Sequence, residues 1–192
     1  MIELNNIKCI SIDEFLNIYN LKILTNLISA FRCDKNLEIE EYLKRNAIEF
    51  NKKHQAMTFI LLDNKNKING YFSLSIKPIT IKKNLLSKNR LKKLLRIANL
   101  TEEENEINPS AYLIAQLGKL SHSNLNIDTI FAFINYYISE AQKICGGVVE
   151  FLESENNQKL INMYTARGFR IFNARKSTGN QDRKLIQMYR LI

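Results

Sequence analysis

The chain has 192 residues, of which 45% are hydrophobic and 24% are charged. These values exclude disorder over the whole length and are typical of a compact protein with a sizeable core. The formal net charge of +9 favours anionic partners, namely nucleic acid, phosphorylated cofactors or an acidic membrane surface.

Apolar residues recur at helical or strand spacing along the chain, and turn residues separate the segments. In chain order we expect a strand at 7–10, helices at 14–28 and 36–50, strands at 57–62 and 68–76, a helix at 83–97, a strand at 111–120, a helix at 128–145, a strand at 148–152, a helix at 158–166, and strands at 169–172 and 185–191. Asp13 is the expected cap of the first helix, and Pro78 is expected to end the first hairpin.

The order of these elements predicts the fold class. The strand at 111–120, the helix at 128–145 and the strand at 148–152 form a crossover unit whose two strands lie parallel. The other strands are joined as hairpins. We therefore expect an α/β (α+β) fold, with a mixed, mostly antiparallel twisted sheet, one parallel strand–helix–strand crossover and helices on both faces. No linker is long enough to divide the chain, so one domain spanning residues 1–192 is expected.

One segment near the carboxyl end carries a spaced motif. Asn157 stands at a helix start, Tyr164 follows seven residues later, and Gly168-Phe169 follows that tyrosine. Asn caps helix starts, Tyr164 lies about two turns on, and glycine ends helices in the left-handed conformation. One interpretation is a capped helix with an aromatic core anchor. The order and context also resemble the carboxyl-terminal motif of GNAT acetyltransferases.

That resemblance implies an acyl-CoA-dependent N-acetyltransferase that moves an acetyl group from acetyl-CoA to a primary amine. It implies that Tyr164 is catalytic and protonates the leaving thiolate. Asn157 and Lys159 would lie beside the cofactor. The whole chain would then be one GNAT-like domain, and such domains often pair as homodimers through edge strands.

The strand 111–120 resembles the GNAT strand that pairs through its backbone with the pantetheine amides. The resemblance assigns cofactor binding to Leu117, Gly118, Lys119 and Leu120. Gly118 suits a β-bulge that aims backbone N–H groups at the thioester carbonyl. A buried strand with a glycine kink is the alternative.

The stretch after this strand departs from the GNAT pattern, because residues 120–129 contain neither glycine nor arginine. In the family, a glycine-rich loop holds the cofactor pyrophosphate with backbone N–H groups. Here Asn124 and Asn126 are the candidate cofactor contacts, since asparagine tolerates left-handed turns. Two interpretations stay open: a divergent acyl-CoA site, or a GNAT-like binding module without catalysis. His122 is either a base or phosphate contact, or a solvated loop histidine.

A narrower resemblance covers Phe31-Arg32-Cys33 and the hairpin segment 70–74. These resemble the toxin-like acetyltransferases of bacterial toxin–antitoxin pairs, which implies aminoacyl-tRNA as an acceptor and an antitoxin partner. The span Lys82–Arg96 holds seven basic residues and no acid, so it is either an RNA contact or a solvated face. The acidic stretch 102–106 would partly neutralise it.

The remaining signals exclude several classes of site. Cys9, Cys33 and Cys145 show no metal-ligand spacing, so we expect free thiols and no metal. The start of the chain lacks a signal-peptide pattern, and no apolar run is long enough to cross a membrane, so a cytoplasmic protein is expected. Glu150 and Glu153 are the candidate general bases, although an α-amino acceptor needs little help.

Overall fold

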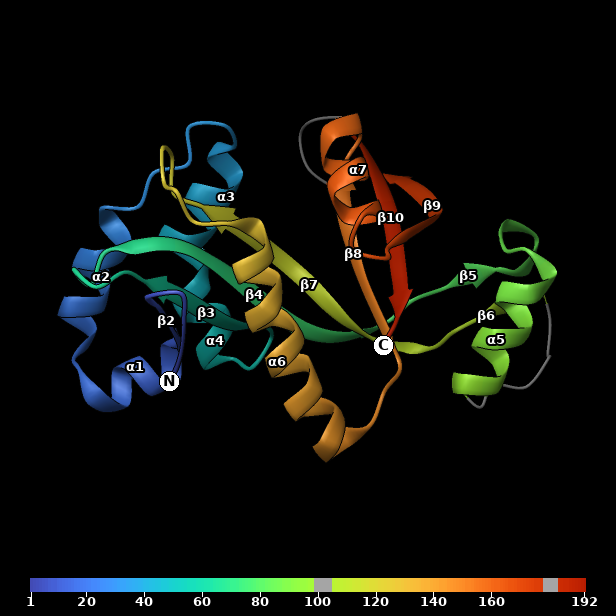
Figure 1. Cartoon of the computed structure of the whole chain (residues 1–192), viewed down its shortest axis with the longest axis horizontal. Coiled ribbons are helices and arrows are strands. Elements are labelled where there is room, and N and C mark those ends of the chain that lie inside the picture. The colour runs from blue at the N-terminus through green and yellow to red at the C-terminus, as the bar shows by residue number, and fades with distance from the viewer. Residues whose placement is uncertain (99–104, 178–182) are drawn as a thin grey trace. The chain divides into compact units, whose positions relative to one another are not determined.

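The structure is a computed structural model that describes residues 1–98, 105–177 and 183–192 (Figure 1). The strands are β1 Ile2–Leu4, β2 Ile7–Ser11, β3 Met57–Leu62, β4 Ile68–Pro78, β5 Ile81–Lys82, β6 Glu106–Ile107, β7 Ser110–Lys119, β8 Val149–Glu155, β9 Arg170–Lys176 and β10 Lys184–Leu191. The helices are α1 Ile12–Ile18, α2 Leu21–Ser29, α3 Leu37–Glu41, α4 Ala47–Lys52, α5 Lys88–Ala98, α6 Ile127–Cys145 and α7 Gln158–Thr165.

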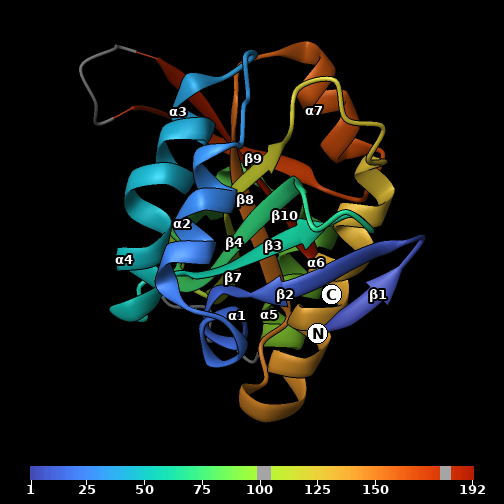
Figure 2. The same ribbon diagram turned by 90° about the vertical axis from the view of Figure 1, so that its left-hand side faces the viewer.

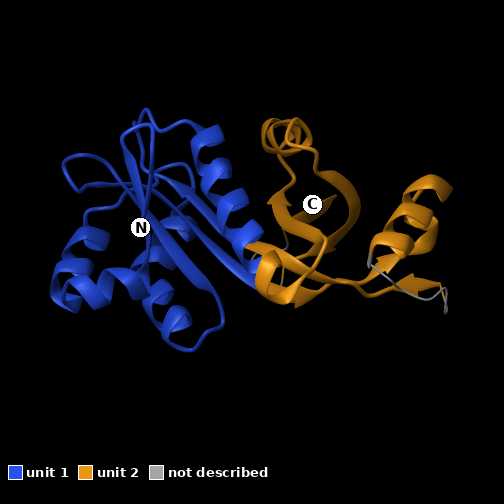
Figure 3. Ribbon diagram, turned by 60° about the horizontal axis from the view of Figure 1, so that its bottom comes forward, with its two compact units in different colours: residues 1–75, 115–141 blue, residues 76–114, 142–192 orange. Residues whose placement is uncertain are grey.

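The described residues cluster into two compact units, each treated by itself (Figure 3). Unit 1 comprises residues Met1–Ser75 and Ala115–Ala141, and unit 2 comprises Ile76–Ile114 and Gln142–Ile192. Strand β7 and helix α6 contribute residues to both units. The expectation of one domain over residues 1–192 stays a prediction.

In unit 1 the strands follow the order β1-β2-β3-β4-β7, and β1 to β4 pair antiparallel. Strand side chains alternate between two faces, and both faces are covered by helices. Ile60 packs with the buried side chains of α1, α2 and the segment 37–52, whereas the ring of Phe59 lies 4.1 Å from that of Tyr137 in α6. Figures 1 and 2 show α6 and the amino-terminal helices on opposite sides of these strands, which confirms the expected helices on both faces.

The expected single helix at 14–28 is wrong, because two helices form there. Ser11 caps α1 in place of Asp13: its hydroxyl accepts from the Glu14 N–H at 3.1 Å, and the Glu14 carboxylate accepts from the Ser11 N–H at 3.1 Å. This reciprocal pair of hydrogen bonds is a capping box, and it satisfies two backbone N–H groups at the helix start, more than a single capping aspartate at position 13 would. Asn20 then caps α2 by accepting from the Ile23 N–H at 3.0 Å.

The second predicted helix does begin after Asn36, whose side chain accepts from the N–H groups of Glu38 and Ile39. It is not uniform. Between α3 and α4 the residues Tyr42–Asn46 form a π-helical turn, a feature that often occurs near functional sites. The ring of Tyr42 stacks on that of Tyr71 at 6.2 Å, so this turn packs directly on strand β4.

In unit 2 the strands follow the order β7-β8-β10-β9. Strands β7 and β8 are parallel, with Tyr112 opposite Glu150, and α6 is the helix that joins them in sequence. Strand β10 pairs antiparallel with both β8 and β9. The prediction of a mostly antiparallel sheet with one parallel crossover is therefore confirmed.

The predicted helix at 83–97 is only partly correct. A 3₁₀ turn covers Lys83–Leu85, Leu86 is extended, and α5 begins at Lys88. The break allows Leu86 to enter the core with Ile81 and Ile107, which pair in the small β5-β6 sheet. The neighbouring apolar side chain, Leu85, is exposed.

Candidate functional site

The carboxyl end of strand β7 lies in unit 1 and carries three of the four strand residues predicted to contact a cofactor, Leu117, Gly118 and Lys119, and the fourth, Leu120, follows the strand directly. Gly118 is buried, and a Cβ atom there would lie 2.6 Å from Ile39 Cγ2 and closer still to the ring of Tyr71. The Tyr71 hydroxyl in turn donates to the Ile39 carbonyl at 2.6 Å. Glycine is thus needed here for space. The proposed bulge and cofactor contacts stay predictions.

The loop after β7 is built from side-chain hydrogen bonds in place of glycines. The Ser121 N–H donates to the Arg32 carbonyl at 2.8 Å, and the Ser121 hydroxyl accepts from the Asp34 N–H at 2.8 Å. This ties the loop to the segment 31–33 that the sequence singled out. His122 is 95% exposed with φ of 60°, and its Nε2 lies 4.0 Å from Asp34 Oδ2. Its surroundings are those of a solvated loop histidine.

Ser123 and Asn126 complete the loop. The Ser123 hydroxyl donates to Asn69 Oδ1 at 2.7 Å and accepts from the Leu125 N–H at 3.0 Å. Asn126 Oδ1 accepts from the Asp128 N–H at 2.9 Å, so Asn126 caps α6. The side-chain oxygen of Asn126, a candidate cofactor contact, is therefore used to hold the loop itself, whereas the contact predicted for Asn124 stays a prediction.

The loop still presents backbone donors. Among the described residues, no hydrogen-bond acceptor faces the N–H groups of His122, Asn124 and Asn126. These three alternate with the engaged N–H groups of Ser121, Ser123 and Leu125. Backbone N–H groups beside a helix start are suited to phosphate oxygens, because they carry partial positive charge and face no neighbouring acceptor.

Unit 2 carries the motif at Asn157, Lys159 and Tyr164. Asn157 caps α7 as predicted, with its Oδ1 accepting from the Lys159 N–H at 2.9 Å. Gly168 has φ of 88°, the left-handed conformation expected for a glycine that ends a helix. Asn157 and Lys159 are exposed, whereas Tyr164 is 9% exposed and packs edge-to-face on Phe169, with ring centroids 6.0 Å apart.

The environment of Tyr164 sets its chemistry. Burial raises the pKa of the Tyr164 phenol to about 12, while Arg167 acts to lower it and Glu155 to raise it further. The phenol is therefore protonated at neutral pH. Such a group is a weak acid, and it stabilises a nearby anion mainly by donating a hydrogen bond to it.

Each of the two candidate bases is bound by an arginine, and the sequence analysis predicted neither of these two arginine partners. Glu153 accepts from Arg175 Nε at 2.7 Å and Nη2 at 2.5 Å and from Gln187 at 2.8 Å. Burial raises the pKa of Glu153, but these hydrogen bonds outweigh it and hold the pKa below its usual range. Glu150 is fully buried against Arg190, and burial raises its pKa against the pull of that guanidinium. Glu150 is thus shielded from solvent, and Glu153 has a depressed pKa, so neither carboxylate combines the exposure and the basicity that a general base needs.

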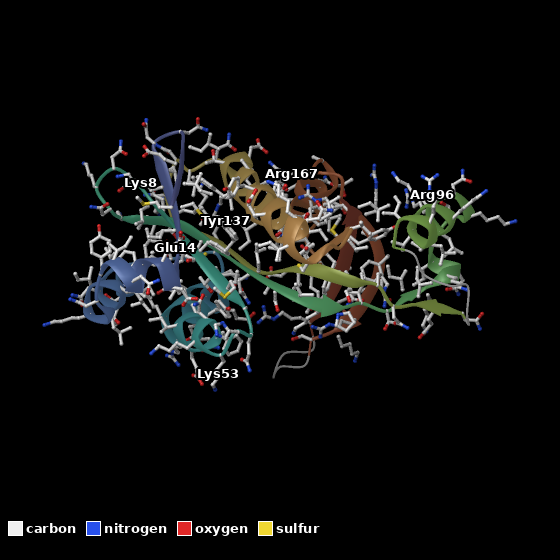
Figure 4. The ribbon with its side chains drawn as sticks, turned by 90° about the horizontal axis from the view of Figure 1, so that it is seen from below. Lys8, Glu14, Lys53, Arg96, Tyr137 and Arg167 are labelled. Atoms are coloured by element: carbon white, nitrogen blue, oxygen red, sulfur yellow. The ribbon has the colours of Figure 1, made fainter. Side chains whose placement is uncertain are left out.

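Helix α5 of unit 2 forms a basic surface. Its Leu94 is buried with Leu86 and Ile81 in the unit 2 core, while the opposite side is charged. The basic residues of this span are Lys82, Lys83, Lys88, Arg90, Lys92, Lys93 and Arg96. Figure 4 shows Arg96 on the outer side of α5. Within the described residues no ion pair involves any of the seven, and Glu102, Glu103 and Glu104 lie outside those residues.

Two further sequence expectations concern the described part of the chain. Over residues 1–98, 105–177 and 183–192, no cluster of His, Cys, Asp or Glu could hold a metal ion. The helices within the same ranges are too short or too polar to span a bilayer. Cys9, Cys33 and Cys145 are all free, as expected.

Comparison with known proteins places this fold. No family model matches the sequence, and no curated protein matches it either. Solved structures do match. One is titled "AtaT complexed with acetyl-methionyl-tRNAfMet" (TM-score 0.64, 16% identity, 94% of this chain and 93% of that chain covered). A second is the crystal structure of a bacterial toxin (TM-score 0.66, 14% identity, 98% of this chain and 92% of that chain covered). A third is the crystal structure of AtaTR bound with AcCoA (TM-score 0.57, 14% identity, 95% of this chain and 93% of that chain covered).

At such identities the likeness concerns the fold alone. The likeness extends over nearly the whole length of each chain. The matched structures include toxin-like acetyltransferases, the group that the sequence resembled. The mixed, mostly antiparallel sheet and its parallel pair β7-β8 agree with this likeness. The chain therefore has the fold of the GNAT acetyltransferases.

Proposed function

We propose that the protein is an acyl-CoA-dependent N-acetyltransferase that moves an acetyl group from acetyl-CoA to a primary amine. The observation that carries the proposal is the geometry of α7, where Asn157 caps the helix and Tyr164 presents a protonated, largely buried phenol. The match to AtaTR bound with AcCoA supports acetyl-CoA as the co-substrate.

Each part of the chain has a role in this proposal. The backbone at Leu117–Leu120 binds the pantetheine arm, and the free N–H groups of His122, Asn124 and Asn126 contact the phosphates. Asn157 and Lys159 contact the cofactor from the start of α7. Acetyl-CoA supplies the activated acyl group. The Tyr164 phenol donates a hydrogen bond to the thiolate as it leaves, and this interaction is stronger in the transition state than in the ground state.

A free amine with a pKa near 8 suits this site as acceptor, because roughly a tenth of it is already deprotonated at neutral pH without a base. Glu150 and Glu153 are engaged by arginines, so a strongly basic lysine side chain would lack a partner to remove its proton. We therefore favour an α-amino group over a lysine ε-amino group as the acceptor.

Two measurements test this function. Isothermal titration with acetyl-CoA should give saturable binding heat. If no binding heat is measured at high cofactor concentration, the protein is not an acetyltransferase but a GNAT-like binding module. The variant Tyr164→Phe should lower turnover by about tenfold or more while cofactor binding stays nearly unchanged. Unchanged turnover would remove Tyr164 from the reaction.

A second, narrower candidate is an aminoacyl-tRNA acceptor with an antitoxin partner. The basic surface of α5 favours it, since phosphate contacts by Lys and Arg dominate RNA affinity. The AtaT structure with acetyl-methionyl-tRNAfMet supports the same acceptor class. Acetyl transfer to charged tRNA should weaken steeply with salt, and equal activity on free amino acids would argue against it. The expected homodimer and cytoplasmic setting stay predictions.

A further inference from the structure

A buried ion pair stands behind the α7 motif in unit 2. Arg190 of β10 lies directly opposite Glu150 of β8 in the strand register. Its Nε and Nη2 both approach Glu150 Oε2 at 2.6 Å, and the two side chains are 15% and 0% exposed. The other carboxylate oxygen, Glu150 Oε1, is buried and has no hydrogen-bond partner among the described residues. Among the described residues, the Glu150 carboxylate is therefore held by hydrogen bonding to Arg190 and to no other side chain.

The same guanidinium reaches the turn that ends α7. Arg190 Nη1 donates to the carbonyl of Arg167 at 3.1 Å, and its central carbon lies 4.7 Å from the centroid of the Phe169 ring. Arg167 and Phe169 are the neighbours of Gly168, and Figure 4 shows Arg167 in this region. One side chain therefore joins strand β8 to both sides of the left-handed glycine.

This turn is bonded to Tyr164 in two ways. The N–H groups of Arg167 and Phe169 both donate to the Tyr164 carbonyl, at 2.9 and 3.2 Å. The Phe169 ring, which is fully buried, meets the Tyr164 ring edge-to-face at an interplanar angle of 72°. A displacement of Arg190 would therefore reach Tyr164 through a backbone connection and through a ring connection.

We propose that Arg190, held in place by Glu150, is a positioning residue that fixes the Tyr164 phenol for hydrogen-bond donation during acetyl transfer. The proposal rests on the function proposed above. Its physical basis is the fork of the guanidinium, which makes hydrogen bonds to Glu150 and to the Arg167 carbonyl and a further ion-pair contact to Glu150, while its flat face covers an aromatic ring. A catalytic donor misplaced by a fraction of a bond length loses much of its effect, so its support must be rigid.

Lysine cannot reproduce this arrangement, because its ammonium is a point charge without a flat face. Arg190→Lys keeps the charge next to Glu150 but cannot serve the Arg167 carbonyl and the Phe169 ring at the same time. The variant therefore separates charge neutralisation from positioning. A matched control is Arg175→Lys, which alters a similar two-bond arginine–glutamate pair of unit 2, and within the described residues the guanidinium of Arg175 bonds to Glu153 and Lys176 and not to the α7 turn.

The kinetic test is a double-mutant cycle with Tyr164→Phe. We expect Arg190→Lys to lower kcat about tenfold with little change in KM, but by less than about twofold when Tyr164 is already phenylalanine. Equal losses in both backgrounds would mean that Arg190 supports the fold only, and would overturn the proposal. If Arg190→Lys does not fold, Phe169→Leu breaks the ring connection with the ion pair intact, and the same pattern is expected.

A second readout does not need activity. In protein labelled with 3-fluorotyrosine, the Tyr164 resonance is identified by its loss in Tyr164→Phe. Arg190→Lys should shift and broaden that resonance, whereas Arg175→Lys should leave it in place. An unmoved resonance in Arg190→Lys overturns the positioning role. If the wild-type protein transfers no acetyl group, the proposed enzyme fails, and the resonance still decides whether Arg190 orders Tyr164.

Discussion

Gly118 in strand β7 offers a sharp test of how the predicted cofactor strand is packed. The substitution Gly118→Ala adds a single methyl group at a point where the strand meets the side chains of Ile39 and Tyr71. The added carbon would lie 2.6 Å from Ile39 Cγ2 and 2.9 Å from Tyr71 Cδ1, both far inside van der Waals contact. Because the backbone of Gly118 is not left-handed, any cost comes from crowding alone.

The crowding cannot be relieved cheaply. The Tyr71 ring is fully buried, and its hydroxyl is bonded to the Ile39 carbonyl. Overpacking of a tight core costs about 1–3 kcal/mol, and two held neighbours place this site near the upper end. A loss of about 3 kcal/mol lowers the melting temperature by about 6–12 °C in a chain of this size.

Urea unfolding followed by circular dichroism measures this loss as a change in the free energy of unfolding. Two comparisons sharpen it. Gly70→Ala should cost less, because its added carbon meets the tip of the Leu125 side chain at 2.8 Å and the Gly118 carbonyl oxygen only at 3.0 Å, whereas three contacts below 3.0 Å crowd Gly118. In a Tyr71→Leu background, Gly118→Ala should cost much less than alone, since the ring it strikes is gone. A cost below about 0.5 kcal/mol, or one unchanged by Tyr71→Leu, would refute the reasoning.

Three further outcomes are expected. Asn157→Ala removes the α7 cap and should lower the free energy of unfolding by about 1 kcal/mol in urea titrations, whereas Asn157→Asp should retain most of it. The pKa of Glu153 in the folded state is depressed, so the ionised carboxylate stabilises the fold above its unfolded pKa of about 4.3. This contribution to the free energy of unfolding is lost as the pH falls through the folded-state pKa. Acid unfolding of Glu153→Gln should therefore lack this loss of stability. Reversing charge at Lys92 and Lys93 should weaken RNA binding and flatten its salt dependence, and an equal loss from Lys65→Glu would show a nonspecific charge effect.

Local signals explain why the α7 motif was readable from the sequence. A cap by Asn157 and a left-handed end at Gly168 depend on residues within a few positions of each other, and both formed as predicted. Apolar segments bounded by turn residues likewise predicted the hairpin β3-β4, and the strand–helix–strand order predicted the crossover from β7 to β8. The start and the split of the first helix also have local signals, because Ser11 and Glu14 form a capping box before α1 and Asn20 caps α2.

Contacts between distant positions decided the rest. Gly118 suggested a bulge from sequence, but its neighbours Tyr71 and Ile39 come from other elements and require a small residue for space. Leu86 leaves the helical pattern because the core of unit 2 takes it in.

The sequence by itself determined the order of the longer strands and most helices, the fold class and the motif from Asn157 to Phe169, because periodicity, caps and glycine ends act over a few residues. Only the tertiary structure decided that Glu153 and Glu150 are bound by arginines and that Arg190 supports the end of α7. These partners are 22, 40 and 23 residues apart, and no local pattern specifies which charge a strand register will bring opposite another.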